Sequence, residues 1–328
     1  MAGLSFLPGM LQPHPWLLAA GAALDLAIGD PVYRAHPVRL IGWTLTRFEN
    51  GLRRIGLDGY FGGIALFLLL VAVWVGGAVV VFGRLGGMLG NIAGMALHVF
   101  LVFSLLALHD LLLHGWNVER AAQQGDVAGA RVAIAKLVGR DTSKMDSAAC
   151  SRAAIESLSE NLTDGFISPI FWYAVGGIPG LLLFKVVSTM DSMVGYKTPR
   201  YLQFGWCGAR TDDLMNLLPA RLTYLLIAGL AACVPGCSAW GALQVGWRQH
   251  DIVPGPNSGW SEAATAGAIG RRLIGPIWAG GTLVTEIWLG DATEPPAGQP
   301  GDFRRAAILL TATGLSSLAL AITALVCL

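Results

Sequence analysis

The stretch GGIALFLLLVAVWVGGAVVVF, residues 62–82, decides the fold class of this chain because it carries no charged side chain. A helix of about 20 apolar residues spans the hydrocarbon core of a bilayer, so this stretch predicts a transmembrane helix. Residues 92–113 and 306–328 form two further apolar stretches of similar length. We therefore expect a protein that crosses the membrane several times.

The composition of the chain agrees with this expectation. Of 328 residues, 54% are hydrophobic and only 13% are charged, about half the ~25% that is usual in soluble domains. So little charge argues against a disordered chain, a coiled coil and a typical cytosolic enzyme. The balance of 22 basic and 21 acidic residues gives no case for nucleic acid as a partner. The five cysteines contain no C-x-x-C pair, which argues against a zinc site or a disulfide framework.

Three other apolar segments carry features that break a helix. Residues 16–28 are short for a span, whereas residues 166–187 and 222–245 contain Pro and Gly. Such segments predict broken helices or re-entrant hairpins, which are tolerated at membrane depth against protein or a water-filled cavity. The fold class we predict is all-α: a polytopic integral membrane helical protein with broken or re-entrant helices and cytoplasmic helical loops.

Basic residues concentrate in the segments between the apolar stretches, and the positive-inside rule places those segments in the cytoplasm. We expect a single membrane-embedded domain over residues 1–328. Within it we expect catalytic cytoplasmic loops at 115–165 and 188–221, a further cytoplasmic loop at 246–305 and a linker at 291–304.

The densest polar constellation is SRAAIESLSENLTDG, residues 151–165. Helical spacing puts Arg152, Glu156 and Glu160 on one face, and Asp164 stands where we expect the helix to end. Magnesium favours a few carboxylates together with phosphate oxygens, so this face suits a magnesium site. The alternative is a solvated helix face stabilised by an Arg152–Glu156 ion pair.

A second constellation occupies residues 188–221, directly after an apolar run. Its charged and phenolic side chains are Asp191, Tyr196, Lys197, Arg200, Arg210, Asp212 and Asp213. Lys and Arg beside carboxylates can bind phosphate and metal together. The alternative is an ordinary juxtamembrane loop with solvated charges.

Two shorter segments complete the set of candidates. The first contains Asp30, His36 and Arg39, and a lone histidine in such a segment is more often structural than catalytic. In the second, Ser258 or Ser261 would cap a helix that starts near Glu262, or the Gly-containing loop would hold an anion at the helix start. The sequence has no Walker A loop, no nucleophile elbow and no H-E-x-x-H motif.

Four stretches in this order resemble the adenosylcobinamide-phosphate synthase family of cobalamin biosynthesis, CobD/CbiB. They are LDLAIGDP with AHPVRLIG, ESLSENLTDGFISPIFWYAVGG, KVVSTMDSMVGYKTPRYLQFGWCGARTDDLMNLLPARLT and PNSGWSEAATAGAIGRRL. Together they extend from residue 24 to about residue 290, which is most of the chain.

The resemblance implies an ATP-dependent ligase of the inner membrane, with its active loops facing the cytoplasm. It would join adenosylcobyric acid to (R)-1-aminopropan-2-yl phosphate, or a related amino-alcohol phosphate, and release adenosylcobinamide phosphate. It implies ATP and Mg²⁺ as cofactors, the lipid bilayer as surroundings and other late corrinoid-pathway membrane enzymes as possible partners.

We assign hypothetical roles on this basis. The catalytic candidates are Glu156, Glu160, Asp191, Lys197, Asp212 and Asp213. The substrate- or phosphate-binding candidates are Asp30, His36, Arg39, Asn161, Tyr196, Arg200, Arg210, Asn257, Ser258 and Glu262. The magnesium candidates are Glu156, Glu160 and Asp164.

Two other functions are compatible with parts of this pattern. A non-enzymatic membrane regulator of the AmpE type would keep the fold, although we would expect it to lose some of the ordered acidic and basic loops. A membrane transporter would also use broken helices and intramembrane charges. Against transport, the charges lie in the loops and the two halves of the chain show no repeat.

Overall fold

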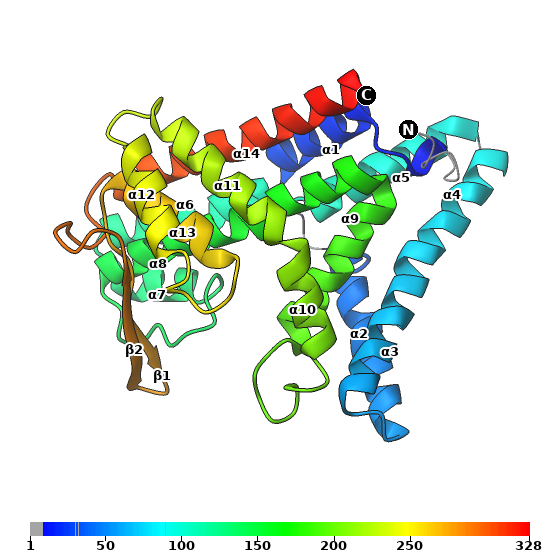
Figure 1. The fold of residues 1–328 in the computed structure, drawn as a ribbon, viewed down its shortest axis with the longest axis horizontal. Coiled ribbons are helices and arrows are strands. Elements are labelled where there is room, and N and C mark those ends of the chain that lie inside the picture. Colours follow the sequence, from blue (N-terminus) through cyan, green and yellow to red (C-terminus); the bar gives the residue numbers. More distant parts are fainter. Residues whose placement is uncertain (1–8, 30, 32, 89) are drawn as a thin grey trace. The chain divides into compact units, whose positions relative to one another are not determined.

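The computed structural model describes residues 9–29, 31, 33–88 and 90–328, which are mostly helical (Figure 1). Four helical runs are long and apolar enough to cross a membrane: Tyr60–Arg84, Ile92–Gln123, Ser147–Val194 and Asp302–Cys327. A fifth becomes possible if a bent pair of helices, Trp206–Met215 and Leu217–Ala231, counts as one span. The prediction of an all-α polytopic membrane protein is confirmed.

The chain forms two compact units, each built from separate stretches of sequence. The first unit comprises residues 1–107, 168–215 and 318–328. Its helices are α1 (Pro15–Ile28), α2 (Pro37–Arg54), α3 (Tyr60–Val71), α4 (Gly77–Met88), α5 (Gly90–Leu105), α9 (Ser168–Val194) and α10 (Trp206–Met215). Two short turns accompany them, η1 (Gly9–Leu11) and the π-helical η2 (Ala72–Gly76). Part of the core lies among α2, α3 and α9, where Leu45, Leu66 and Val186 are fully buried.

Helix α9 is broken in its first half, as its Pro and Gly content predicts. Gly177 has φ 61° and ψ −147°, which is not a helical conformation, and Pro179 follows two residues later. A side chain at Gly177 would also collide with the backbone carbonyl of Leu11. Glycine is therefore required there both for the positive φ and for the close approach of the chain. That this segment re-enters the membrane on one side stays a prediction.

The second unit comprises residues 108–167 and 216–317. Its elements are α6 (Leu108–Gln123), α7 (Val127–Ile134), α8 (Ser147–Leu162), the π-helical turn η3 (Thr163–Ile167), α11 (Leu217–Ala231), α12 (Ala239–Gln249), α13 (Ser258–Ile269), β1 (Leu273–Ala279), β2 (Thr282–Leu289) and, up to residue 317, α14 (Asp302–Cys327). Helices α11, α12 and α13 pack against one another, and α8 packs against α6, α7 and α13. The predicted break at Pro235 and Gly236 is the turn between α11 and α12.

The helix that carries Glu156 and Glu160 does not end at Asp164, which corrects our expectation. After Leu162 the backbone widens into η3, which contains Asp164 and Gly165, and the helical run continues to Val194. Single π-helical turns inside helices are rare and frequently occur at functional sites.

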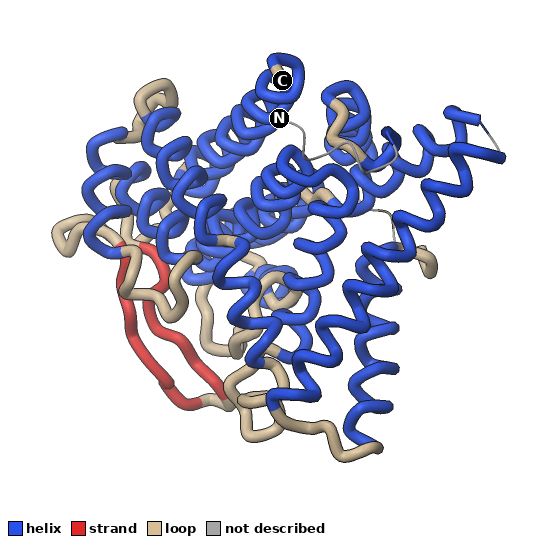
Figure 2. Tube along the Cα trace, turned by 45° about the vertical axis from the view of Figure 1, so that its right-hand side comes forward, coloured by secondary structure: helices blue, strands red, loops and turns tan. Residues whose placement is uncertain are grey.

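One β-hairpin interrupts the helical architecture, and our sequence analysis missed it. Strands β1 and β2 are antiparallel, and they pair Ala279 with Thr282 around a turn formed by Gly280 and Gly281 (Figure 2, red). Both glycines have positive φ, 55° and 79°, as a two-residue hairpin turn requires. Two glycines between apolar and β-branched runs were the signal that could have predicted the hairpin.

Candidate active site

Helices α8 and α13 of the second unit bring together the carboxylates of Glu156, Glu160 and Glu262, which we call the buried carboxylate group. Glu156 and Glu160 lie one turn apart on α8, and α13, which carries Glu262, packs against α8. Glu262 is only 2% exposed, and every residue from Gly259 to Ile269 is buried. Its Oε2 atom is buried and has no hydrogen-bond partner in the described part of the chain.

Arg140, in the loop between α7 and α8, is the cation that pairs with Glu156. Its guanidinium donates a 2.6 Å hydrogen bond to Glu156 Oε2, and the two side chains are only 10% and 16% exposed. The expected alternative of a solvated face with an Arg152–Glu156 ion pair is therefore wrong. Arg152 instead donates to the carbonyl oxygens of Ile274 and Ala297, at 3.0 and 3.3 Å. Sequence analysis did not single out Arg140, because a loop arginine gives no local sign of its partner.

The protonation of Glu262 depends on the other members of the buried carboxylate group. Burial raises its pKa well above the usual value, and the nearby carboxylates of Glu160 and Glu156 raise it further. Arg140 acts in the opposite direction and offsets only part of this effect. A cation bound beside these carboxylates would relieve the repulsion and lower the pKa of Glu262.

The buried carboxylate group fits a magnesium ion only in part. No set of three or more His, Cys, Asp or Glu side chains is arranged to hold a metal ion among the described residues. The unpartnered oxygen of Glu262 nevertheless offers a ligand atom of the kind that magnesium prefers. Magnesium commonly takes one or two carboxylates and completes its coordination with phosphate oxygens and water. Protein carboxylates would therefore supply only part of the ligand set here.

The remaining candidates of the second unit lie on the same two elements or directly beside them. Asn161 donates from its side-chain amide to the Ser157 carbonyl on α8, and Asp164 lies half-buried in η3. Asn257 accepts a 2.9 Å hydrogen bond from Arg221. Helix α13 begins at Ser258 and not near Glu262, and its N-cap residue, Asn257, makes no capping hydrogen bond to the helix. The expected capping by Ser258 or Ser261 is therefore wrong.

The charged segment after α9 belongs to the first unit and is mostly exposed. Tyr196 is 59% exposed and Lys197 is also exposed. Arg200 pairs with the buried Glu49 at 3.0 Å, and Arg210 pairs with Asp213 at 3.3 Å.

The aspartates of this segment lie on its two helices. Asp191 is half-buried in the last part of α9, and Asp212 lies beside Asp213 on α10. Asp213 is close enough to Asp191 to act on it electrostatically. A solvated juxtamembrane loop thus describes the arginines and the lysine better than it describes the aspartates.

His36 and Arg39 line a cavity of about 380 Å³ within the first unit. Lys185 of α9 and Ser104 of α5 line it as well, and both side chains are buried. The sequence analysis missed Lys185, although a single lysine inside an apolar run is itself a signal of function or pairing. Asp30, the remaining candidate of this segment, lies outside the described residues.

The predicted residues thus fall into two sets, one in each unit. The second unit holds Glu156, Glu160, Asn161, Asp164, Asn257, Ser258 and Glu262, and the first holds the other described candidates. The roles that we assigned to them remain predictions.

The fold and the site define the class of this protein: it is a polytopic helical membrane protein that buries carboxylates beside an arginine. The family model described as CobD/Cbib protein matches residues 18–310. The chain is 41% identical over 295 residues to the cobalamin biosynthesis protein CobD of Pelobacter propionicus, covering 88% of this chain and 89% of that protein. It is 39% identical over 280 residues to the cobalamin biosynthesis protein CbiB of Salmonella arizonae, covering 82% and 85%. The chain belongs to the CobD/CbiB family. No solved structure matches it.

Proposed function

We propose that this protein is an adenosylcobinamide-phosphate synthase, an ATP-dependent ligase of cobalamin biosynthesis. Its relatives of known name are cobalamin biosynthesis proteins, which supports a role in that pathway. The proposed reaction joins adenosylcobyric acid to (R)-1-aminopropan-2-yl phosphate or a related amino-alcohol phosphate. It belongs in the inner membrane, with the active loops on the cytoplasmic side.

The observation that carries this proposal is the buried carboxylate group with its single ion-paired member. Glu156 is paired with Arg140, whereas one oxygen of Glu262 has no partner among the residues that the structure describes. A buried, unpaired polar atom costs about 1–3 kcal/mol, so a site that only stabilised the fold would gain by an apolar residue there. A site that binds a cationic ligand recovers this cost when the ligand arrives.

The chemistry of the proposed reaction needs two steps. The carboxylate of the corrinoid is a poor electrophile, and it would first attack the γ-phosphorus of ATP, which gives an acyl phosphate and ADP. The amine of the amino-alcohol phosphate would then attack the acyl carbon, lose a proton and expel inorganic phosphate, which leaves the amide. Charge on the transferred phosphoryl group must be offset in the first step.

The residues of this chain would divide that work. Glu156 and Glu160, with Asp164, would hold magnesium, and Glu262 beside them would offer a further ligand oxygen. When bound, magnesium would neutralise charge on the phosphate oxygens. Lys197, Arg200 and Arg210 would contact phosphates. Asp212 or Asp213 would orient an arginine or accept the proton of the attacking ammonium group.

An in vitro assay tests the proposed reaction. The purified protein is mixed with adenosylcobyric acid, ATP, magnesium and one candidate amine at a time, and products are followed by mass spectrometry. We expect the amide product and ADP only when all components are present. Absence of ATP hydrolysis under these conditions would favour the regulator, and uptake of unchanged substrate into sealed vesicles would favour the transporter.

Two variants test the assigned site separately from the reaction. Glu160→Gln removes a charge of the buried carboxylate group, and Lys197→Ala removes an exposed cation of the first unit. We expect each to lower turnover by roughly 10²-fold or more, as loss of a charge-stabilising group typically does. Wild-type turnover in both variants would show that these residues are not part of the active site. It would not contradict the proposed reaction.

The membrane location has a separate explanation to test. We propose that late corrinoid-pathway enzymes gather in the same membrane, so that the product of one passes directly to the next. The next enzyme of the pathway should then co-purify from native membranes after mild detergent extraction. Its absence from such preparations would contradict the association.

A further inference from the structure

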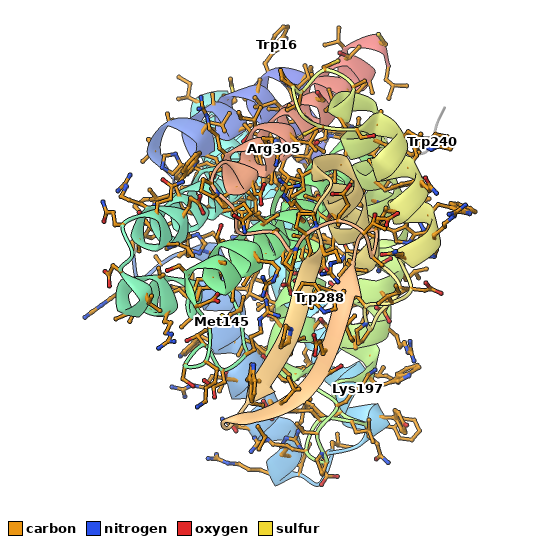
Figure 3. The ribbon with its side chains drawn as sticks, turned by 90° about the vertical axis from the view of Figure 1, so that its left-hand side faces the viewer. Trp16, Met145, Lys197, Trp240, Trp288 and Arg305 are labelled. Atoms are coloured by element: carbon orange, nitrogen blue, oxygen red, sulfur yellow. The ribbon has the colours of Figure 1, made fainter. Side chains whose placement is uncertain are left out.

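Two arginines of the second unit contact the same tryptophan, and neither forms an ion pair with a carboxylate in the described part of the chain. The guanidinium carbons of Arg152 and Arg272 lie 5.1 and 4.7 Å from the centre of the Trp288 ring. Trp288 stands near the end of β2, at the base of the hairpin (Figure 3). We call Arg152 and Arg272, the two arginines that contact Trp288, the Trp288 arginine pair.

Arg152 is buried, and its side chain donates hydrogen bonds to neutral acceptors. The side chain is only 9% exposed, and it donates to the neutral carbonyl oxygens of Ile274 and Ala297. Arg140 and Arg272 are both close enough to repel it electrostatically, and Asp146 and Glu156 are close enough to offset part of that repulsion. Three guanidinium groups are thus gathered in a place largely removed from water.

Arg272 is the least satisfied of the three. Its guanidinium makes no hydrogen bond within the described residues, and its buried Nε atom has no partner. The buried Nε atom of Arg140 likewise has none. Unpaired donors of this kind are expensive to keep unless a ligand accepts from them in another state of the protein.

The backbone of the hairpin is shaped to hold this arrangement. Ile274, whose carbonyl accepts from Arg152, has φ 69°, which is an outlier for a β-branched residue. A side chain at the next residue, Gly275, would meet Trp288 at 2.9 Å and Arg152 at 3.2 Å. Strained residues that persist in a fold cluster at ligand-binding and active sites.

We infer that the Trp288 arginine pair, together with Arg140, binds a phosphate group of a substrate. Planar guanidinium groups present forked donors that match phosphate oxygens. Several guanidinium groups together offer more N–H donors than one carboxylate could accept. Arg140 also contacts Glu156, so the phosphate would lie beside the buried carboxylate group. This inference rests on the proposed function for its two possible ligands, ATP and the amino-alcohol phosphate.

A binding experiment separates these ligands and does not depend on turnover. The full chain in lipid nanodiscs is titrated with ATP, (R)-1-aminopropan-2-yl phosphate and inorganic pyrophosphate, with adenosine and 1-aminopropan-2-ol as phosphate-free controls. The variants are Arg272→Met, which keeps the aliphatic stem, and Arg272→Lys, which keeps the charge. Arg304→Met, at an exposed position of α14, is the matched control.

We expect Arg272→Met to weaken binding of a phosphate-bearing ligand by about tenfold or more, as loss of a charge-assisted hydrogen bond does. Arg272→Lys should lie between it and wild type, and Arg304→Met should bind like wild type. Weakened ATP binding alone assigns the nucleotide phosphates to this place, and weakened amino-alcohol phosphate binding alone assigns the acceptor substrate.

Other outcomes overturn the inference. They are wild-type affinity of Arg272→Met for every phosphate-bearing ligand, or failure of the wild-type protein to bind any of them. If Arg272→Met does not fold, Arg272→Lys decides, because wild-type affinity for every phosphate-bearing ligand in that variant contradicts a forked contact. Phosphate binding that depends on Arg272 without any amide formation would keep this inference and reject the proposed ligase.

Discussion

The buried carboxylate group and the charged segment that follows α9 contain similar residue types in very different surroundings. In the first, Glu262 is 2% exposed and Glu156 has one close cationic partner, Arg140. In the second, Arg210 and its partner Asp213 are 67% and 34% exposed. Water screens the charges of the exposed pair, whereas the buried carboxylates are largely removed from that screening and interact more strongly with Arg140 and with one another.

This difference teaches how to weigh charged motifs in a membrane protein. Both segments read as dense clusters of charge, and both carry motifs of the family resemblance. Only the buried group holds charges whose separation from water has a large energetic cost. We therefore expect substitutions of ion-paired residues to lower the free energy of unfolding by different amounts. The loss should be largest in the buried group and smallest at the surface.

The largest effect is expected from Arg140→Met. The substitution leaves Glu156 buried without its cation, and breaking a buried pair in this way costs about 3–5 kcal/mol. Denaturant titration in detergent would measure the loss in the free energy of unfolding. The double variant Arg140→Met/Glu156→Gln should recover part of the stability. If Arg140→Met alone is as stable as wild type, the buried ion pair contributes no more to stability than the exposed one.

Glu262→Gln should change how stability depends on pH. Because the pKa of Glu262 is raised in the folded protein, the unfolded chain releases this proton at lower pH than the folded chain does. Wild-type stability therefore falls as pH rises above the usual glutamate pKa, and the loss stops once pH exceeds the raised folded value.

Glutamine removes this contribution, so the variant should lose up to about 1.4 kcal/mol less per pH unit within that window. Melting temperatures of both proteins across the acidic to neutral range would measure the two slopes. Parallel curves would mean that Glu262 ionises as it does in water.

Magnesium should bind more tightly as pH rises, if the buried carboxylate group holds it. A cation displaces the proton of Glu262, so its affinity should increase by at most about tenfold per pH unit. Calorimetric titration in two buffers of different ionisation enthalpy would detect the released proton. The dependence should disappear in Glu262→Gln, and an unchanged dependence in that variant would place the ion elsewhere.

The smallest effect is expected from Arg210→Ala. Its ion pair with Asp213 is 3.3 Å long and exposed, and such pairs contribute about 0–1 kcal/mol. Unfolding experiments should show a change near the error of measurement that shrinks further at high salt. A loss as large as that of Arg140→Met would show that this surface is covered in the native protein.

Several parts of the fold could be predicted because they depend on local sequence. Residues 62–82 form a transmembrane-length helix because every side chain there is apolar or small, and the break in α9 follows from Gly177 and Pro179. We did not predict the hairpin, although Gly280 and Gly281 indicate its turn. Its strands lie within residues 246–305, which we predicted to be a cytoplasmic loop because of their charges.

The site was less predictable because its contacts join distant residues. Spacing placed Glu156 and Glu160 on one face but suggested Arg152 as the partner, four residues away. The structure instead pairs Glu156 with Arg140, and Arg152 with the carbonyl oxygen of Ile274, 122 residues away in sequence. Helical periodicity contains no information on either contact.

The sequence by itself determined that this is a helical membrane protein and where its charged residues are concentrated, because hydropathy and helical spacing act over short stretches. Only the tertiary structure decided which charges are buried and that Arg152 and Arg272 share Trp288. It also decided that one oxygen of Glu262 has no partner within the described parts of the chain. Burial and pairing arise when helices distant in sequence pack together. The cost of removing a charge from water is therefore fixed by the fold and not by the motif.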